Sequence, residues 1–459
     1  MASAVNEYNG SQHKVRWIVA GIIAAGGAIP LICYGLFFGS IATVTPQQAK
    51  VMLQQQSTMT LLVDVRRSEE FSAGHIDGAV NWPLEAVLDS TGVNNIPPEF
   101  RDKTLLFMCN VGIDSCRAAR HLFALGKDRT FNVRGGIQEW IRSVAVEQAA
   151  RPLGGRVTLQ DLISDATPPQ GTIFDRWRIA PDQVVDFPFR RSPLREQALA
   201  VLSFFFIKPI YELLSLILII FLWRSRSRDL TAVRWAMIFF FLGENACALN
   251  YFLFKETSYL SEYLHSYGML LCFGFMAYAV LEGVDARILK LSDPQQRCAA
   301  SGLCGSCIKY ADVPCGLKRM FYLLIPALIL LALMLPAADW QNNSYNTIIF
   351  GKYYNYAHLW IYQLYENWFC AAATVLMLGI SLLILCVKKE NAIFWAKIAF
   401  AAGIGPLGFG MLRMIIGGAY DRNRVWYLFW EETTELLLIT SICLILWIFR
   451  RGLFPRSTA

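Results

Sequence analysis

A cysteine that follows an apolar run is the residue of this chain whose surroundings best suit nucleophilic chemistry. Cys109 comes directly after residues 104–108 (TLLFM), a run typical of a buried strand, and a helical pattern opens at Ser115. A short loop between a strand and a helix turns several backbone N–H groups toward one point, at the positive end of the helix dipole. Because such donors stabilise a thiolate, the pattern predicts a nucleophilic sulfur. The alternative is a buried, inert thiol.

The residues around Cys109 alternate between strand and helix patterns. Residues 61–65 (LLVDV) are typical of another buried strand, and residues 115–125 follow a helical pattern. This alternation predicts a small α/β layer. Cys116 lies one residue into the predicted helix. In an oxidising compartment it could form a disulfide with Cys109. We expect instead that Cys116 faces the core.

Three ordered motifs in this region resemble those of the rhodanese family. They are Asp64-Val65-Arg66 with Gly74-His75-Ile76-Asp77-Gly78, then Cys109-Asn110-Val111-Gly112-Ile113-Asp114-Ser115, and last Arg134-Gly135-Gly136-Ile137-Gln138-Glu139-Trp140. The resemblance covers under a quarter of the chain. It implies that Cys109 takes a sulfane sulfur from a donor such as thiosulfate, holds it as a persulfide and passes it to a thiol or another nucleophile. Residues Asn110, Val111, Gly112, Ile113, Asp114 and Ser115 would then form the persulfide or anion-binding loop. We expect Asp64, Arg66 and His75 to support the domain through buried hydrogen bonds.

The composition of the loop narrows this chemistry. Related phosphatases of this fold carry an arginine six positions after the cysteine, where this chain has Ser115, so sulfur transfer is favoured over phosphate hydrolysis. Many active rhodaneses carry a basic residue in the loop, where this chain has Asp114. A carboxylate there opposes both a thiolate and an anionic donor. The sequence thus favours a polysulfide or protein-persulfide donor over thiosulfate, or else a sensing domain without activity.

The composition of the whole chain indicates an α-helical membrane protein. Of 459 residues, 55% are hydrophobic and 17% are charged, which excludes an ordinary soluble enzyme and a disordered chain. A first apolar run, residues 17–39, is too long for a usual signal peptide and predicts a retained anchor. Seven more runs predict about eight spans in all: 200–223, 233–253, 264–283, 320–337, 358–387, 392–418 and 429–449. Lys208 and Pro209 interrupt the second run, so residues 197–210 either cross the membrane or lie on its surface.

These runs predict a polytopic protein with an inserted rhodanese-like α/β domain. Its parts would be a cytoplasmic N-terminus (1–16), the anchor (17–39), the α/β domain (45–145), a linker (146–196), a seven-span domain (197–451) with a cysteine-rich loop (284–319), and a tail (452–459). Most Lys and Arg residues of the short connections fall on the side that holds both termini, such as Arg224, Arg226, Lys388 and Lys389. By the positive-inside rule this side is cytoplasmic. The α/β domain is then expected on the outer, periplasmic side of a bacterial-type inner membrane.

Four cysteines in the predicted cytoplasmic loop have a spacing that suggests a metal site. Cys298, Cys304, Cys307 and Cys315 follow the pattern C-x5-C-x2-C-x7-C. A reducing cytoplasm disfavours disulfides, so the cluster predicts a tetrahedral zinc or an iron–sulfur cluster, with unligated or redox-active thiols as the alternative. The spacing lies closest to a plant-type iron–sulfur pattern, but it does not distinguish zinc from an iron–sulfur cluster.

Ionisable residues also fall inside the predicted spans. They are Glu244, Glu366, Arg413, Glu431 and Glu435. A carboxylate at this depth costs several kcal/mol unless it is paired, protonated or hydrated. Two readings stay open: an ion-paired network that joins helices near the outer interface, and a path for a proton, a cation or a polar substrate.

Two function classes follow from these patterns. The first is a membrane-anchored sulfurtransferase whose Cys109 persulfide serves a membrane region that transports or senses a sulfur species. The second is a redox membrane subunit. In it the cysteine-rich loop holds a metal cluster and contacts a redox partner, and the rhodanese-like domain serves only as a binding or sensing module. His265 and His358 lie at outer span ends, but interfacial histidines are usually anchors, so we do not expect haem b. No nucleic-acid-binding pattern is present, and the lipid bilayer is the expected surrounding.

Overall fold

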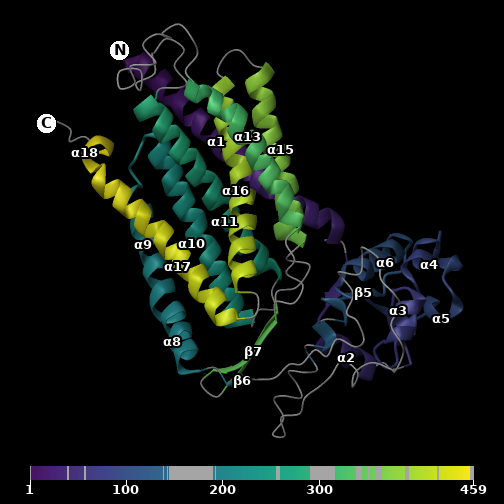
Figure 1. The fold of residues 1–459 in the computed structure, drawn as a ribbon. Coiled ribbons are helices and arrows are strands. Elements are labelled where there is room, and N and C mark those ends of the chain that lie inside the picture. The colour runs from purple at the N-terminus through teal and green to yellow at the C-terminus, as the bar shows by residue number, and fades with distance from the viewer. Residues whose placement is uncertain are drawn as a thin grey trace.

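The structure of the protein is a computed structural model. It describes residues 2–38, 41–55, 58–137, 139–141, 143, 190–191, 193–254, 259–289, 316–337, 344–349, 352–357, 364–387, 392–420 and 423–454. Within these residues the chain forms an α/β domain and a larger region that is mostly helical (Figure 1). Most of the predicted linker and of the cysteine-rich loop lies outside the described residues.

The α/β domain is built on a parallel sheet of five strands. The strands are β1 (Thr43–Val44), β2 (Thr60–Asp64), β3 (Val80–Asn81), β4 (Thr104–Met108) and β5 (Thr130–Val133), and their spatial order is β1-β5-β4-β2-β3. Every residue of the central strand β4 is buried, as expected for a strand covered on both faces. Because parallel strands all end at the same edge, residue 109 is delivered to the carboxyl edge of the sheet. The predicted α/β layer is confirmed.

Short helices cover the two faces of this sheet. They are α2 (Pro46–Gln55), α3 (Ser68–Ala73), α4 (Leu84–Leu88), α5 (Pro98–Arg101) and α6 (Ile113–Ala124). One face of α6 is apolar and packs on the core through Cys116, Ala119 and Leu122. Its opposite face carries charged residues such as Arg117. This amphipathic pattern anchors α6 and so holds its N-terminus next to residue 109.

Helices, most of them long, make up most of the remainder of the described chain. They are α1 (Ala2–Phe38), α8 (Leu194–Leu202), α9 (Lys208–Phe221), α10 (Arg228–Phe254), α11 (Tyr259–Val284), α13 (Gly316–Met334), α15 (Cys370–Val387), α16 (Ala392–Ala419), α17 (Arg424–Ile448) and α18 (Arg450–Leu453). A second sheet, β6 (Arg190–Arg191), β7 (Ser344–Ile349) and β8 (Lys352–Ala357), lies at one end of the helices. The α/β domain lies toward this end, and the labels N and C lie toward the other (Figure 1).

Six of the helices are long and apolar enough to cross a membrane. They cover Val15–Leu36, Leu194–Phe221, Arg228–Asn250, Leu260–Arg287, Tyr365–Val387 and Ala392–Ile416. Two of the predicted spans are not among the six. The apolar part of α13, Phe321–Met334, is shorter, and α17 carries three glutamates within one and a half turns. The six helices support a membrane-associated protein, and the count of eight stays a prediction.

The chain does not break at Lys208 and Pro209. A π-helical turn, Ser203–Ile207, joins α8 to α9, so that Leu194–Phe221 form one continuous rod. Pro209 has no N–H to donate, and a widened turn before it accommodates this loss. Residues 197–210 are therefore part of a helix long enough to span, and the π turn directs Lys208 into the protein, where it is 9% exposed.

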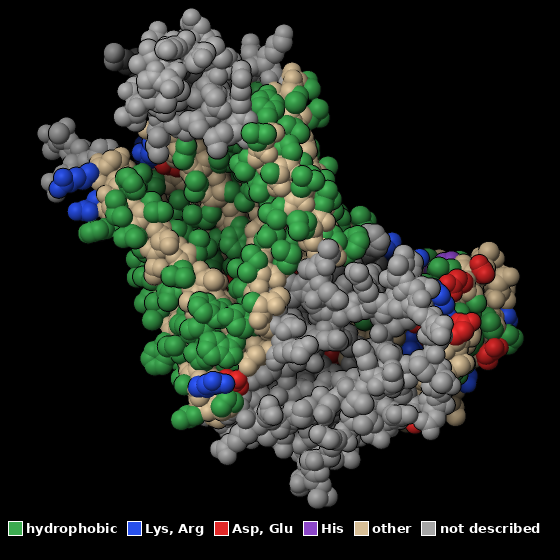
Figure 2. Space-filling model, viewed as in Figure 1, with side chains coloured by type: hydrophobic (Ala, Val, Ile, Leu, Met, Phe, Trp, Pro, Cys, Tyr) green, Lys and Arg blue, Asp and Glu red, His purple; other side chains and the backbone are tan. Residues whose placement is uncertain are grey.

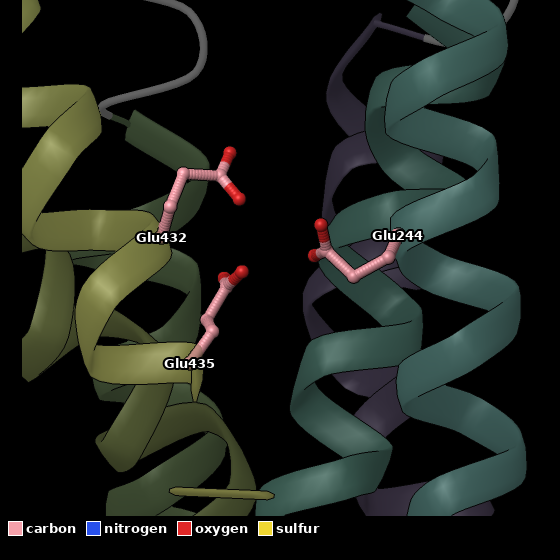
Figure 3. Close-up of side chains that lie close together, drawn as sticks. All are labelled: Glu244, Glu432 and Glu435. Carbon is pink, nitrogen blue, oxygen red and sulfur yellow. The ribbon is translucent and has the colours of Figure 1, made fainter. Parts of the chain in front are cut away.

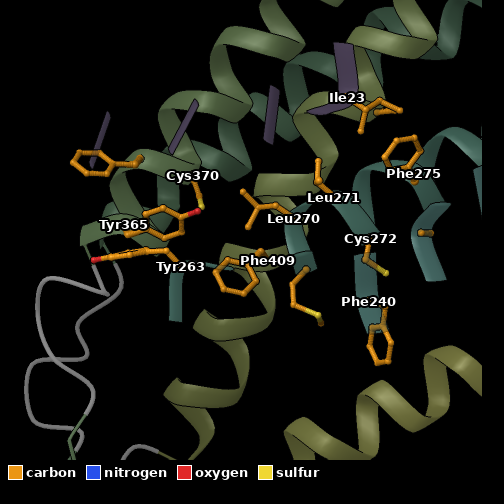
Figure 4. Packing of buried hydrophobic residues seen from close by; sticks show 14 of the residues in the cluster. Ile23, Phe240, Tyr263, Leu270, Leu271, Cys272, Phe275, Tyr365, Cys370 and Phe409 are labelled. Atoms are coloured by element: carbon orange, nitrogen blue, oxygen red, sulfur yellow. The ribbon is translucent and has the colours of Figure 1, made fainter. Parts of the chain in front are cut away.

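Apolar side chains lie both inside and outside the helical region. Its visible face is covered with hydrophobic residues, whereas Lys, Arg, Asp and Glu gather on the α/β domain and at helix ends (Figure 2). Exposed large residues include Leu213, Ile220 and Leu323, the arrangement expected of helices that contact lipid. The interior holds close-packed rings such as Tyr263 against Tyr365, with centroids 5.4 Å apart (Figure 4).

Candidate functional site

Cys109 lies at the bottom of a tight loop between β4 and α6. Gly112 has φ of 89°, a left-handed conformation that glycine adopts at little cost, and its N–H donates to Cys109 Sγ at 3.1 Å. The Ser115 hydroxyl lies 3.3 Å from the same sulfur and 2.8 Å from Asn132 Oδ1 on β5. The hydroxyl has one proton, so donation to the sulfur and donation to Asn132 compete. The loop thus offers the sulfur one backbone N–H and, in competition with Asn132, one hydroxyl.

The segment of residues 134–137 packs against the backbone of this loop. Gly136 has φ of +58°, and a Cβ atom placed on it would lie 2.1 Å from the carbonyl oxygen of Cys109. The Ile137 N–H donates to that same carbonyl oxygen at 2.8 Å. Because only a glycine permits this approach, the Arg134-Gly135-Gly136 motif positions the backbone of the cysteine itself.

Asp64, Arg66 and His75 support the domain from within. Arg66 donates to both carboxylate oxygens of Asp64, at 3.0 and 2.6 Å, and to the carbonyl oxygen of Gly74 at 2.6 Å. His75 Nδ1 lies 2.9 Å from the carbonyl oxygen of Phe71, and the two rings stack. Asp64 and Arg66 are buried, so a bidentate pair replaces the water that their charges lose. None of the hydrogen bonds named here reaches Cys109 Sγ.

The surroundings of Cys109 favour a thiol over a thiolate in the resting protein. Its side chain is 3% exposed, and burial raises the pKa of the thiol. The nearby Asp114 carboxylate raises the pKa further, while the Ser115 hydroxyl and backbone N–H groups of the loop lower it only in part. Asp114 itself is half exposed and lies 3.4 Å from Arg117. The sulfur is therefore shielded, and a nucleophilic role would require the thiol to lose its proton first.

Replacing Asp114 by Asn should make Cys109 more reactive at neutral pH. Removal of the negative charge lowers the pKa of the Cys109 thiol, so more thiolate is present below that pKa. We expect the midpoint of the pH–rate profile for alkylation to move to lower pH, and the rate at pH 7 to rise about two- to fivefold. Iodoacetamide trapping of Cys109 with mass spectrometry measures both. An unchanged profile would show that Asp114 does not influence the sulfur.

Cys116 faces the core, in agreement with the prediction from the helix pattern. It is 1% exposed, and burial, with a contribution from Cys109, raises the pKa of its thiol to about 12. Such a thiol supplies almost no thiolate at neutral pH. We therefore expect Cys116→Ala to keep sulfur transfer within about twofold of wild type in a donor-consumption assay. A large loss of turnover in a folded Cys116→Ala protein would instead assign the second cysteine a role in the reaction.

The parallel sheet, the glycine-supported loop and the cysteine at the helix N-terminus together define a rhodanese-like domain. A family model described as the rhodanese-like domain matches residues 45–143. Over 101 residues the chain is 31% identical to the thiosulfate sulfurtransferase GlpE of Glaesserella parasuis, a stretch that covers 22% of this chain and 86% of that protein. The chain therefore belongs to the rhodanese family through this domain.

Other similar proteins match the same domain only. The chain is 32% identical over 104 residues to the adenylyltransferase and sulfurtransferase uba4 of Ogataea parapolymorpha, and the match covers 22% of this chain and 25% of that protein. It thus spans about a quarter of the length of this relative. A rhodanese-like domain of Anabaena sp, solved by NMR, is 16% identical, with 28% of this chain and 97% of that chain covered and a TM-score of 0.19.

The predicted cysteine site and one histidine fall on parts of the chain that the structure does not describe. Cys298, Cys304, Cys307 and Cys315 lie outside the described residues, and so does His358. A zinc or iron–sulfur centre at the four cysteines therefore stays a prediction. His265 lies within the described residues and is buried.

The ionisable residues predicted at membrane depth come together in one buried polar region. Arg413 contacts Glu431 through Nη1, lies 3.4 Å from Glu366 and donates to the Tyr427 hydroxyl at 2.7 Å. Its Nη2 lies 3.3 Å from His265 Nε2. A guanidinium only donates, so Nε2 must accept and the proton of a neutral His265 resides on Nδ1. The ion-paired network that joins helices is thus formed around Arg413.

His265 connects Arg413 to a second group around Lys208. The Nδ1 atom of His265 lies 3.4 Å from Glu244 Oε1. Lys208 contacts Glu244 Oε2 and lies 3.5 Å from Glu432 Oε1. Gly243 of α10 and Gly268 of α11 bring these two helices close enough for the contact, since a Cβ on Gly268 would lie 2.7 Å from Gly243 Cα.

Sequence reasoning did not assign a role to Lys208 or Tyr211 in this group. The Tyr211 hydroxyl lies 2.8 Å from Glu244 Oε2 and 2.5 Å from Glu432 Oε2. A lysine within an apolar run was one available signal, because a buried ammonium at membrane depth requires a carboxylate partner. By itself, the interruption at Lys208 and Pro209 indicates only a change in how the helix is placed in the membrane.

Proposed function

We propose that this protein is a membrane-anchored sulfurtransferase that carries sulfane sulfur as a persulfide on Cys109. The observation that supports this most directly is Cys109 Sγ at the carboxyl edge of the sheet, facing the N–H of Gly112 and the hydroxyl of Ser115. These donors can stabilise a thiolate before the reaction and the terminal sulfur of a persulfide after it. The relatives named as sulfurtransferases support the same chemistry.

The proposed reaction has two sulfur-transfer steps. In the first, the Cys109 thiolate attacks the sulfane sulfur of a donor, a new S–S bond forms, and the donor leaves as a shorter polysulfide or a thiolate. In the second, an acceptor thiolate attacks the outer sulfur of the persulfide and releases the Cys109 thiolate. Neither step requires a net oxidant, because the sulfur atom moves without a change in the total electron count.

The position of Asp114 favours an uncharged or weakly charged donor. The carboxylate opposes the approach of an anion to Cys109, and no Lys or Arg occupies residues 110–116 of the loop. Thiosulfate carries two negative charges, whereas a protein persulfide or a protonated polysulfide carries fewer. We therefore propose polysulfide or a protein persulfide as the donor, and a protein thiol as the acceptor.

Persulfide formation on the intact protein tests this proposal. After incubation with polysulfide and removal of excess donor, the peptide that contains Cys109 should gain the mass of one sulfur atom, and dithiothreitol should remove it. Thiosulfate at the same concentration should give a smaller yield. If neither donor adds sulfur to Cys109 in a folded protein, the domain is a binding or sensing module rather than a sulfurtransferase.

We also propose that the helical region spans an inner membrane, with both termini cytoplasmic and the rhodanese-like domain outside. The six apolar helices support membrane insertion, and the basic connections support this orientation. An impermeant maleimide added to intact cells should label Glu99→Cys, an exposed position of the domain, and should spare Arg226→Cys until the cells are permeabilised. The reverse pattern would place the domain in the cytoplasm.

Coupling of the sulfur chemistry to the helical region is the wider part of the proposal. In this view the helical region transports or senses the sulfur species that the domain handles. The spacing of Cys298, Cys304, Cys307 and Cys315 supports a redox alternative, in which these residues hold zinc or an iron–sulfur cluster. Metal analysis and visible absorption of the purified chain separate the two. Iron with a visible chromophore favours the redox protein, and a colourless protein without iron contradicts it.

A further inference from the structure

Three buried glutamates face one another between two helices of the helical region. Glu432 and Glu435 extend from α17 toward Glu244 on α10 (Figure 3). Each is at most 4% exposed, and one carboxylate oxygen of each lies within 4.8 Å of the others. We call these three residues the carboxylate cluster. They come from segments separated by almost 200 positions, and the packing of both α10 and α17 against α9 brings them together.

The hydrogen bonds of the carboxylate cluster leave oxygen atoms without a partner. Glu244 Oε2 contacts Lys208 and Tyr211, and Glu432 contacts the same two residues. Within the described part of the chain, however, Glu435 Oε2 accepts no hydrogen bond. Glu244 Oε1 accepts none either, since His265 Nδ1 lies 3.4 Å from it and closer, at 3.2 Å, to the carbonyl oxygen of Gly243. A buried carboxylate oxygen without a donor is strongly disfavoured, so these atoms point to a ligand.

The charges of the site indicate what kind of ligand fits. When all three carboxylates are ionised, the single ammonium of Lys208 leaves two negative charges uncompensated in the cluster. Uncompensated charge of this size is costly away from water. A divalent cation would neutralise these two charges. Lys208 contacts Oε2 of Glu244, so the cation would bind on the side of Oε1.

The oxygens of the carboxylate cluster lie close enough together to share one cation. Calcium binds oxygen at about 2.3–2.6 Å, so two ligands on opposite sides of the ion are about 4.6–5.2 Å apart. One carboxylate oxygen of each glutamate lies within 4.8 Å of the others, so all three can reach one such ion. Magnesium usually keeps several waters and is seldom bound by protein ligands alone, so a buried set of three carboxylates suits calcium better. Ligands that are all oxygen also disfavour soft metals.

We propose that Glu244, Glu432 and Glu435 bind a hard divalent cation of about the size of Ca²⁺ between α10 and α17. This inference is independent of the reaction at Cys109, because it concerns the helical region alone. Bound cation would join two helices through charge, and Lys208 and Tyr211 would orient the carboxylates from α9 as positioning residues. The helical region would then contain its own ion site in addition to the rhodanese-like domain.

Equilibrium binding of radioactive Ca²⁺ to the full chain in detergent tests this proposal. Wild type should bind one Ca²⁺ per chain, and Glu435→Gln should weaken binding at least about tenfold, since affinity depends on the number of charged ligands. Glu366→Gln is the matched control: it removes a buried carboxyl group next to Arg413, outside the carboxylate cluster, and should keep wild-type affinity. The predicted cysteine site does not confuse this assay, because thiolates prefer softer metals.

Two further measurements keep the result clear. Glu435→Asp retains the charge and should bind Ca²⁺ more tightly than Glu435→Gln, and saturating Ca²⁺ should raise the thermal stability of wild type but not of Glu435→Gln. If Glu435→Gln does not fold, the Ca²⁺ affinity of wild type is compared with the affinities of Glu435→Asp and Glu366→Gln instead. Absence of Ca²⁺ binding by wild type would overturn the proposal. Equal Ca²⁺ affinity in wild type and Glu435→Gln would also overturn it. An infrared band of protonated Glu435 in a protein that binds no Ca²⁺ would do the same.

Discussion

Cys109→Ser should reduce sulfur transfer from polysulfide by at least about 1000-fold while the protein stays folded. A serine hydroxyl in the same loop is a poor nucleophile toward sulfane sulfur, and it cannot form a persulfide. The size change is small, and the donors from Gly112 and Ser115 remain, so the loop should keep its conformation. Turnover is measured by donor consumption with a thiol acceptor, on the full chain in detergent.

The outcome of this experiment separates three roles for the domain. A loss in Cys109→Ser with normal turnover in Cys116→Ala assigns the nucleophile to the loop. Equal turnover in wild type and Cys109→Ser would reject Cys109 as the nucleophile. No turnover in wild type with either donor would mean that burial and Asp114 leave the domain as a binding or sensing module.

Gly136→Ala should destabilise the rhodanese-like domain by about 3–5 kcal/mol and abolish persulfide formation. A Cβ atom at this position would lie 2.1 Å from Cys109 O and 2.8 Å from Asn110 C, both of them backbone atoms. The positive φ costs about 1 kcal/mol for alanine, and displacement of the loop costs about 2–4 kcal/mol more. Hydrogen exchange of the β4 and β5 peptides in the full chain measures the local free energy of unfolding.

Gly78→Ala is the matched control for this variant. Gly78 also has a positive φ, of 79°, but a Cβ there would have open space around it. The control should therefore lose only about 1 kcal/mol and keep sulfur transfer. Similar losses in Gly78→Ala and Gly136→Ala would contradict the role assigned to the close approach of Gly136 to the cysteine loop.

Local patterns were sufficient to predict the α/β domain and the strand–loop–helix segment that contains Cys109. The buried strand before Cys109 and the helix after it are encoded in contiguous residues, so their order follows from composition and periodicity. The supporting hydrogen bonds of Asp64, Arg66 and His75 were expected for the same reason, since all three belong to one short motif. The contact between Gly136 and Cys109 was not visible, because it joins residues 27 positions apart across the sheet.

The contacts between polar groups of the helical region, in contrast, could not be predicted from local patterns. The sequence indicates that Glu244, Arg413 and Glu435 lie in apolar runs, and their cost in such places requires partners. It does not indicate which partners. A carboxylate on one helix can face any neighbouring helix, and helix rotation and crossing are decided by side-chain packing along the whole interface.

What the sequence determined by itself is the chemistry of short segments: a cysteine between a strand and a helix, apolar runs of spanning length, and basic connections on one side. Only the tertiary structure decided that the π turn before Lys208 directs its ammonium toward Glu244 and Glu432, and that Glu435 shares their site. The reason is physical. Backbone and hydropathy preferences act over a few residues, whereas ion pairs between helices depend on distances that close packing sets after the helices have formed.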